Sequence, residues 1–163
     1  MGNLNKTNIN IGVIGLGFVG LTTALGFADK GFSVRGYDVD GNRSEAIISG
    51  QIPFIEPGLN DAIDRTLGRR FHIADTLKEV ATLSDVIFVC VGTPASVDGS
   101  ADLCFLLDAV ADICKNWGSE RKRLIVIKST VPPSTTSDII LPHLIEQVEG
   151  FSEKFSVAVN PEF

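Results

Sequence analysis

Short apolar runs alternate with longer amphipathic segments along the sequence, and this alternation limits the chain to very few fold classes. Six runs predict β-strands, at residues 10–14, 33–37, 71–74, 86–91, 124–128 and 156–159. Most are nearly continuous in valine and isoleucine, which is typical of strands buried on both faces of a parallel sheet. Helices are predicted between them, at residues 18–30, 41–49, 58–67, 76–82, 102–116 and 135–149. The repetition predicts an α/β fold, a doubly wound parallel sheet with right-handed crossovers and helices on both faces.

Length and composition favour one domain over residues 1–163. Hydrophobic residues make up 44% of the sequence and charged residues 21%, so the chain can bury a sizeable core. Pro142 falls inside the last helical pattern, where it is expected to kink or shorten the helix. The sequence ends just after the sixth predicted strand, and we therefore expect it to be part of a longer protein.

A glycine-rich turn joins the first predicted strand to the first predicted helix. Its sequence is Gly15-Leu16-Gly17-Phe18-Val19-Gly20. In this setting Gly15 permits the tight turn, Gly17 lets the backbone approach a pyrophosphate, and Gly20 lets the helix pack close to the strand. The start of the helix offers N–H groups and a partial positive charge to phosphates. The pattern predicts a Rossmann dinucleotide-binding fold with six strands, usually in the order 3-2-1-4-5-6.

Asp38 ends the second predicted strand, at the distance from the glycines that dinucleotide-binding domains require. A carboxylate there accepts hydrogen bonds from the ribose hydroxyls and repels the 2′-phosphate of NADP, so NAD is the predicted cofactor. Arg43 is close enough to contact the ribose or a phosphate. The alternative is that the glycines serve only turns and that Asp38 caps a helix.

Ligands of open parallel sheets lie at the carboxyl ends of the strands, where this sequence places small polar residues and prolines. The fourth strand runs into Val91-Gly92-Thr93-Pro94 and the fifth into Lys128-Ser129-Thr130-Val131-Pro132-Pro133. The sixth runs into Asn160-Pro161-Glu162-Phe163. From spacing alone, Thr93 and Thr130 either contact a ligand or cap turns and helices.

Charge and cysteine usage exclude several classes of function. The formal net charge of -6 disfavours nucleic acids and anionic membrane surfaces as partners. The three cysteines show no CxxC spacing, which favours a reducing, cytoplasmic location with free thiols. The same cysteine pattern and the lack of a HExxH segment predict no metal site, and the lone His72 and His143 are interpreted as structural or solvated.

Six segments together resemble the UDP-glucose/GDP-mannose dehydrogenase family. They are IGVIGLGFVGL, YDVD, IPFIEPGL, VCVGTPASVDGSADL, IVIKSTVPPST and VNPEF. They occur in the family's order over nearly the whole chain, and this joint pattern is far more specific than the glycine turn. The similarity is strongest to the UDP-glucose 6-dehydrogenase branch.

The resemblance implies an enzyme that oxidises a nucleotide-sugar alcohol to a carboxylate with two NAD⁺, through a cysteine-bound thiohemiacetal and thioester. It implies cofactor contacts from Gly15, Gly17, Phe18, Val19, Gly20, Asp38, Arg43, Val91, Thr93, Pro94, Ser129, Thr130 and Val131. Thr130 also resembles the family threonine that helps to hold the catalytic water. Glu162 resembles the first glutamate of the family's NPEF segment, which could act as general base or positioner for thioester hydrolysis.

The family's nucleophilic cysteine belongs to a later glycine-rich segment that these 163 residues do not contain. The resemblance therefore implies the N-terminal NAD-binding domain of a longer enzyme, which binds NAD but is inactive alone. For the full-length enzyme it implies a nucleotide-sugar substrate and a homodimer. Two alternatives are the cofactor domain of a β-hydroxyacid-type dehydrogenase and a non-catalytic NAD-binding module.

Overall fold

The computed structural model describes residues 9–52, 54–96, 99–116 and 122–161. Its six strands are β1 Asn10–Ile14, β2 Ser33–Tyr37, β3 Phe71–Ile73, β4 Val86–Val89, β5 Arg123–Ile127 and β6 Phe155–Val159. They form one sheet in the order β3-β2-β1-β4-β5-β6, and all five neighbouring pairs are parallel. The predicted fold class and strand order are therefore confirmed. β4 ends two residues earlier than predicted, because the chain leaves the sheet there to form a loop.

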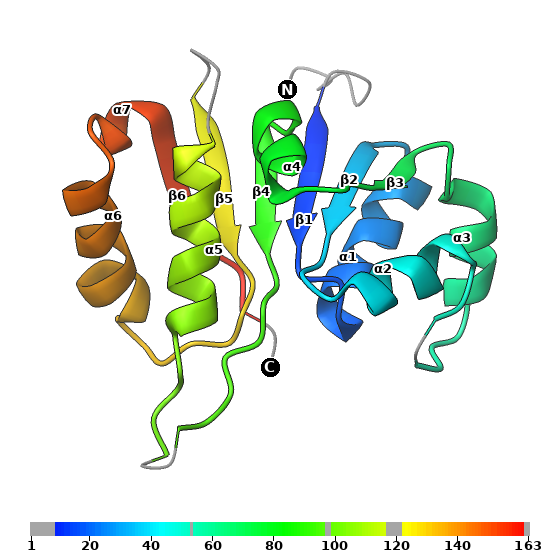
Figure 1. Ribbon diagram of the computed structural model, residues 1–163, viewed down its shortest axis with the longest axis horizontal. Coiled ribbons are helices and arrows are strands. Elements are labelled where there is room, and N and C mark those ends of the chain that lie inside the picture. Colours follow the sequence, from blue (N-terminus) through cyan, green and yellow to red (C-terminus); the bar gives the residue numbers. More distant parts are fainter. Residues whose placement is uncertain (1–8, 53, 97–98, 117–121, 162–163) are drawn as a thin grey trace, which may run out of the picture.

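Helices cover both faces of the sheet. They are α1 Phe18–Asp29, α2 Gly41–Ile48, α3 Leu59–Thr66, α4 Leu77–Leu83, α5 Cys104–Lys115, η2 Thr136–Ile140, α6 Leu141–Gln147 and α7 Phe151–Lys154. One apolar layer joins the sheet to α1, α2 and α3, and the other joins it to α4, α5 and α6. Figure 1 shows α1, α2 and α3 beside the β1–β3 half of the sheet, with α5 and α6 beside the β4–β6 half.

Pro142 divides the last predicted helix, as expected. The segment begins as the π-helical turn η2 and continues as the α-helix α6, with Pro142 in its first turn. Proline lacks an N–H donor and its ring obstructs the preceding turn of a regular helix, so the backbone widens before it. The helix ends at Gln147, and the short α7, which was not predicted, follows Gly150 in its left-handed conformation.

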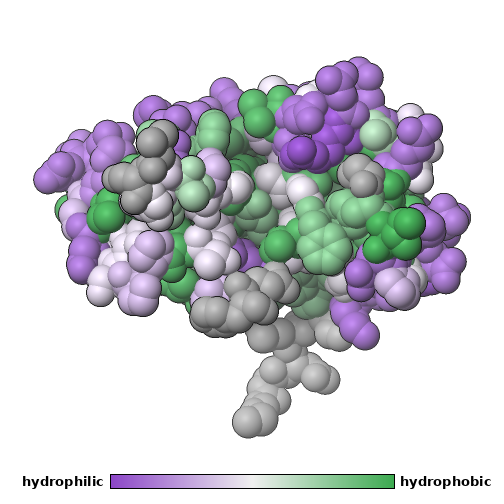
Figure 2. Space-filling model, turned by 90° about the horizontal axis from the view of Figure 1, so that it is seen from below, coloured by the Kyte–Doolittle hydropathy of each residue, from purple (hydrophilic) through white to green (hydrophobic). Residues whose placement is uncertain are grey.

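The parallel arrangement brings all six carboxyl ends to one edge of the sheet, the lower edge in Figure 1. Figure 2 looks onto this edge and shows hydrophobic surface gathered over its middle and its α1–α3 side, with hydrophilic side chains mostly around it. Two exposed apolar residues follow β1 and β2, namely Phe18, which is 51% exposed, and Val39, which is 89% exposed. This edge carries the residues predicted to bind a ligand.

Candidate functional site

The turn from β1 into α1 requires glycine at two positions. Gly15 has a φ angle of +87°, and a Cβ atom built there would lie 2.9 Å from the carbonyl oxygen of Cys90. A Cβ atom at Gly20 would collide with the carbonyl oxygen of Gly15. These contacts involve backbone, which cannot move aside as a flexible side chain does. The two glycines therefore allow the tight turn and the close approach of α1 to β1.

Gly17 differs from Gly15 and Gly20 because its Cα atom faces open space. Its φ angle is −65°, and a Cβ atom built there meets no atom of the described residues within 4 Å. The helix α1 begins at the next residue and has no acidic side chain in its first turn. The first N–H groups of a helix lack intrahelical partners and favour anions. The turn thus fits the pyrophosphate of a dinucleotide.

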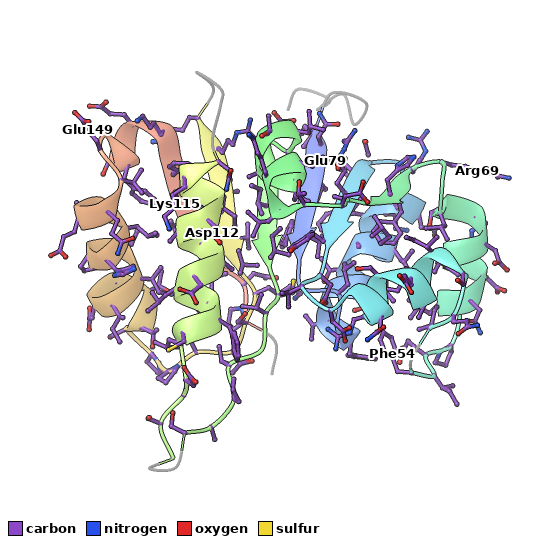
Figure 3. The ribbon with its side chains drawn as sticks, in the orientation of Figure 1. Phe54, Arg69, Glu79, Asp112, Lys115 and Glu149 are labelled. Carbon is purple, nitrogen blue, oxygen red and sulfur yellow. The ribbon has the colours of Figure 1, made fainter. Side chains whose placement is uncertain are left out.

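Phe54 flanks this turn from the loop that follows α2. Its ring packs edge-on against the ring of Phe18, with the two centroids 5.0 Å apart. Figure 3 shows Phe54 toward the lower edge of the molecule, below α2 and α3. Phe54 was not predicted as a site residue, because the contact joins an irregular loop to the first residue of a helix.

Asp38 is bound to the glycine turn by its side chain, of which only 2% is exposed. Its Oδ2 atom accepts hydrogen bonds from the Leu16 N–H at 2.6 Å and from Arg43 Nη1 at 2.8 Å. Its Oδ1 atom accepts one from the Asp40 N–H at 2.9 Å. Asp38 therefore orders the turn itself, a role that the sequence analysis missed. The cap of α2 is Asp40, so the interpretation of Asp38 as a helix cap is wrong.

The described residues supply Asp38 with three hydrogen-bond donors. A carboxylate has about four acceptor positions, and the three donors described above occupy two on Oδ2 and one on Oδ1. The hydrogen bond with Asp38 also raises the pKa of Arg43 above its ordinary value, although partial burial opposes this effect. Arg43 consequently stays charged beside the position predicted for the ribose.

The loops after β4 and β5 are tied together by two predicted site residues. The Ser129 hydroxyl donates to the Val91 carbonyl oxygen at 2.6 Å, and the Thr93 hydroxyl donates to the Thr130 carbonyl oxygen at 2.8 Å. Thr93, Thr130 and Val131 share the lining of a surface hollow of about 320 Å³. Pro94 follows Thr93 and is exposed. The structure thus brings these residues together, and it gives the Thr93 and Ser129 hydroxyls a bracing role.

A third tie joins the ends of β5 and β6. Lys128 Nζ donates to Asn160 Oδ1 at 3.2 Å, and the Asn160 N–H donates to the Ile127 carbonyl oxygen at 2.9 Å. Both side chains were predicted to lie at strand ends, but no role was predicted for them. Glu162, the second predicted catalytic residue, lies outside the described residues.

The cysteines differ in exposure. Cys104 is exposed, Cys90 is partly buried and Cys114 is buried, where desolvation raises the thiol pKa to about 12. In the part of the chain that the structure describes, no three His, Cys, Asp or Glu residues are grouped to hold a metal ion. Within that same part, every helix is too short or too polar to span a membrane.

Comparison with known proteins agrees with this geometry. Residues 9–163 match the NAD-binding domain model of the UDP-glucose/GDP-mannose dehydrogenase family. The chain belongs to that family. The match favours the nucleotide-sugar interpretation over the β-hydroxyacid alternative, and it identifies NAD as the cofactor of this domain.

Relatives within the family share the whole domain. The UDP-glucose 6-dehydrogenase YwqF of Bacillus subtilis is 36% identical over 95% of this chain and 34% of its own length. The structure of a UDP-glucose dehydrogenase from Pyrobaculum islandicum has a TM-score of 0.87 and 37% identity, over 100% of this chain and 38% of that one. A ternary complex of the Pseudomonas aeruginosa GDP-mannose dehydrogenase has a TM-score of 0.85 and 31% identity. The match covers 94% of this chain and 36% of that one. The chain thus spans about a third of the length of these relatives.

Proposed function

We propose that residues 1–163 form the cofactor domain of a cytoplasmic nucleotide-sugar 6-dehydrogenase, a homodimer when full length. The enzyme would oxidise the C6 alcohol of the sugar to a carboxylate with two NAD⁺, and UDP-glucose is the favoured substrate class. The observation that carries the proposal is the glycine turn of a family member, with Gly17 open to a ligand at the start of α1. Similarity to UDP-glucose dehydrogenases over nearly the whole chain supports the choice of substrate.

The residues of this chain would bind and orient the cofactor. The N–H groups of the first turn of α1 would bind the pyrophosphate, and the remaining acceptor position of Asp38 would bind a ribose hydroxyl. Arg43, Val91, Thr93, Pro94, Ser129, Thr130 and Val131 would complete the cofactor contacts. NAD⁺ held by these residues would supply the hydride acceptor, a capacity that belongs to the cofactor rather than to the chain.

Hydrolysis of the cysteine-bound thioester would involve Thr130 and Glu162. Thr130 lines the hollow beside the β4 and β5 loops, where its side chain would hold the attacking water. Glu162 follows β6 closely in sequence and would act as general base or positioner.

We assign the nucleophilic cysteine to a part of the enzyme beyond this sequence. Cys90 packs behind the glycine turn, Cys114 is buried on α5, and Cys104 begins α5. The chain alone should therefore bind NAD without oxidising a nucleotide sugar.

The decisive test replaces Gly17 with alanine. A methyl group at Gly17 meets open space in the protein, so the free energy of unfolding should change little. The same methyl group would occupy the approach of the pyrophosphate, and we expect NADH to bind at least about tenfold more weakly. Calorimetric titration gives the dissociation constant, and urea unfolding gives the stability.

Gly26→Ala is the matched control, because Gly26 also faces open space but lies far along α1 from the turn. Alanine in a helix interior should raise stability by about 0.5–1 kcal/mol and leave NADH affinity unchanged. Equal NADH binding by wild type and Gly17→Ala would reject the cofactor site. Oxidation of UDP-glucose by the chain alone would reject the assignment of the nucleophile.

A further inference from the structure

Arg43 lies between two carboxylates beside the predicted ribose position. Its Nη1 atom is 2.8 Å from Asp38 Oδ2, and its Nη2 atom is 3.7 Å from Asp40 Oδ2. The Asp38 side chain is buried, whereas the side chains of Arg43 and Asp40 are 37% and 44% exposed. The guanidinium therefore lies at the surface with one buried and one exposed anionic partner.

Asp40 is oriented by its role as the N-cap of α2. Its Oδ1 atom accepts hydrogen bonds from the Asn42 N–H at 3.0 Å and from the Arg43 N–H at 3.3 Å. With Oδ1 fixed on the helix end, Oδ2 is the atom that pairs with Arg43. Asparagine and serine cap helices about as well as aspartate does. The cap alone therefore does not explain the negative charge at position 40.

A charge next to Arg43 matters because arginine is the side chain that accommodates the 2′-phosphate of NADP. Its planar fork of donors suits a phosphate, and in this chain the Nη1 and Nη2 ends of that fork already face Asp38 and Asp40. An Arg43 held by both Asp38 and Asp40 is less available for that purpose. NADH carries no 2′-phosphate and makes no such demand on Arg43.

We propose that Asp40 is a specificity-determining residue, which disfavours NADPH by holding the Arg43 guanidinium against Asp38. The proposal rests on the proposed cofactor site at Asp38. Asp38, at the end of β2, would discriminate between NADH and NADPH by direct contact with the cofactor. Asp40 would add to this discrimination by acting on Arg43 rather than on the cofactor. Losing an exposed ion pair changes an equilibrium constant by up to about fivefold. We therefore expect a change of this size in the dissociation constant of NADPH.

The test titrates NADH and NADPH into wild type and Asp40→Asn. Asparagine keeps the cap and removes the charge, so the unfolding midpoint and the NADH affinity should stay close to wild type. We expect NADPH to bind about two- to fivefold more tightly, which narrows the preference for NADH. Glu45→Gln is the matched control, since it removes the same charge from an exposed position on α2 and should leave both affinities unchanged.

A second background separates the action through Arg43 from direct repulsion between Asp40 and the phosphate. In Arg43→Gln, the further change Asp40→Asn should no longer alter the ratio of NADPH to NADH affinity. An undiminished effect in that background would overturn the proposal, and so would an unchanged ratio in Asp40→Asn alone. Wild type that binds neither dinucleotide would instead overturn the cofactor site itself, and this inference with it.

Discussion

Arg123 is the buried charged side chain whose removal should affect stability most clearly. It begins β5, is 6% exposed, and donates through its guanidinium to the carbonyl oxygens of Ala81, Thr82 and Ser84. These carbonyls belong to the end of α4 and the residue that caps it. The last carbonyls of a helix have no intrahelical donor, and a cation there also interacts favourably with the helix dipole. Arg123 therefore attaches the end of α4 to the sheet.

Arg123→Met keeps the apolar stem and removes every donor. Two of the three hydrogen bonds are buried, and a buried acceptor left without a partner costs about 1–3 kcal/mol. The third carbonyl is partly exposed, so water can replace the guanidinium there. Removing the buried charge offsets some of this cost. We expect the free energy of unfolding to fall by about 2–4 kcal/mol.

Urea unfolding followed by circular dichroism measures this loss, with the slope of the transition as the test of two-state behaviour. Arg123→Lys should lose about half as much, because an ammonium keeps the charge but lacks the fork that reaches several carbonyls. NADH affinity should not change, since Arg123 begins a strand whose other end faces the cofactor edge. A loss below about 1 kcal/mol in Arg123→Met would refute the view that these hydrogen bonds anchor α4.

Two further predictions concern the turn and the core. Gly20→Ala should lower the free energy of unfolding by about 2 kcal/mol or more, because the new methyl group meets the backbone of Gly15. It should weaken NADH binding as well. Wild-type stability of this variant in urea unfolding would contradict the prediction. Cys114 has its pKa raised from 9.0 to about 12 by burial, so the stability that the folded thiol contributes is fully present below pH 9 and declines as the pH rises toward 12. The free energy of unfolding should therefore fall less steeply between pH 8 and pH 10.5 in Cys114→Ala than in wild type, and parallel pH profiles would show that Cys114 does not titrate as expected.

Apolar runs were sufficient to predict the sheet, although the edge strands β3 and β6 are only partly buried. The run from Ile11 to Ile14 and the run from Ile125 to Ile127 are buried as their composition indicates. The glycine turn was likewise predictable, since its residues are adjacent in sequence and both Gly15 and Gly20 have a steric reason within the turn itself. These features depend on local chain geometry.

Hydrogen bonds between distant side chains and backbone were not predictable in the same way. The bond from the Leu16 N–H to Asp38 depends on the pairing of β1 with β2, which aligns Ile14 with Tyr37. Arg123 directly precedes the predicted strand at residues 124–128, and its partners on α4 become visible only in the folded chain. In both cases the sequence contains the polar residue but not the identity of its partner.

These contacts decide which substitutions can separate cofactor binding from folding. Asp38, Ser129 and Thr93 all hold backbone groups of the cofactor edge, so replacing any of them changes the shape of the site together with its chemistry. A weaker affinity in such a variant would not distinguish a lost ligand contact from a displaced loop. Gly17 has no side chain to lose and has open space before it, and Asp40 can give up its charge while asparagine keeps its cap. A change in dinucleotide affinity at these two positions, with stability unchanged, therefore reports on the ligand itself.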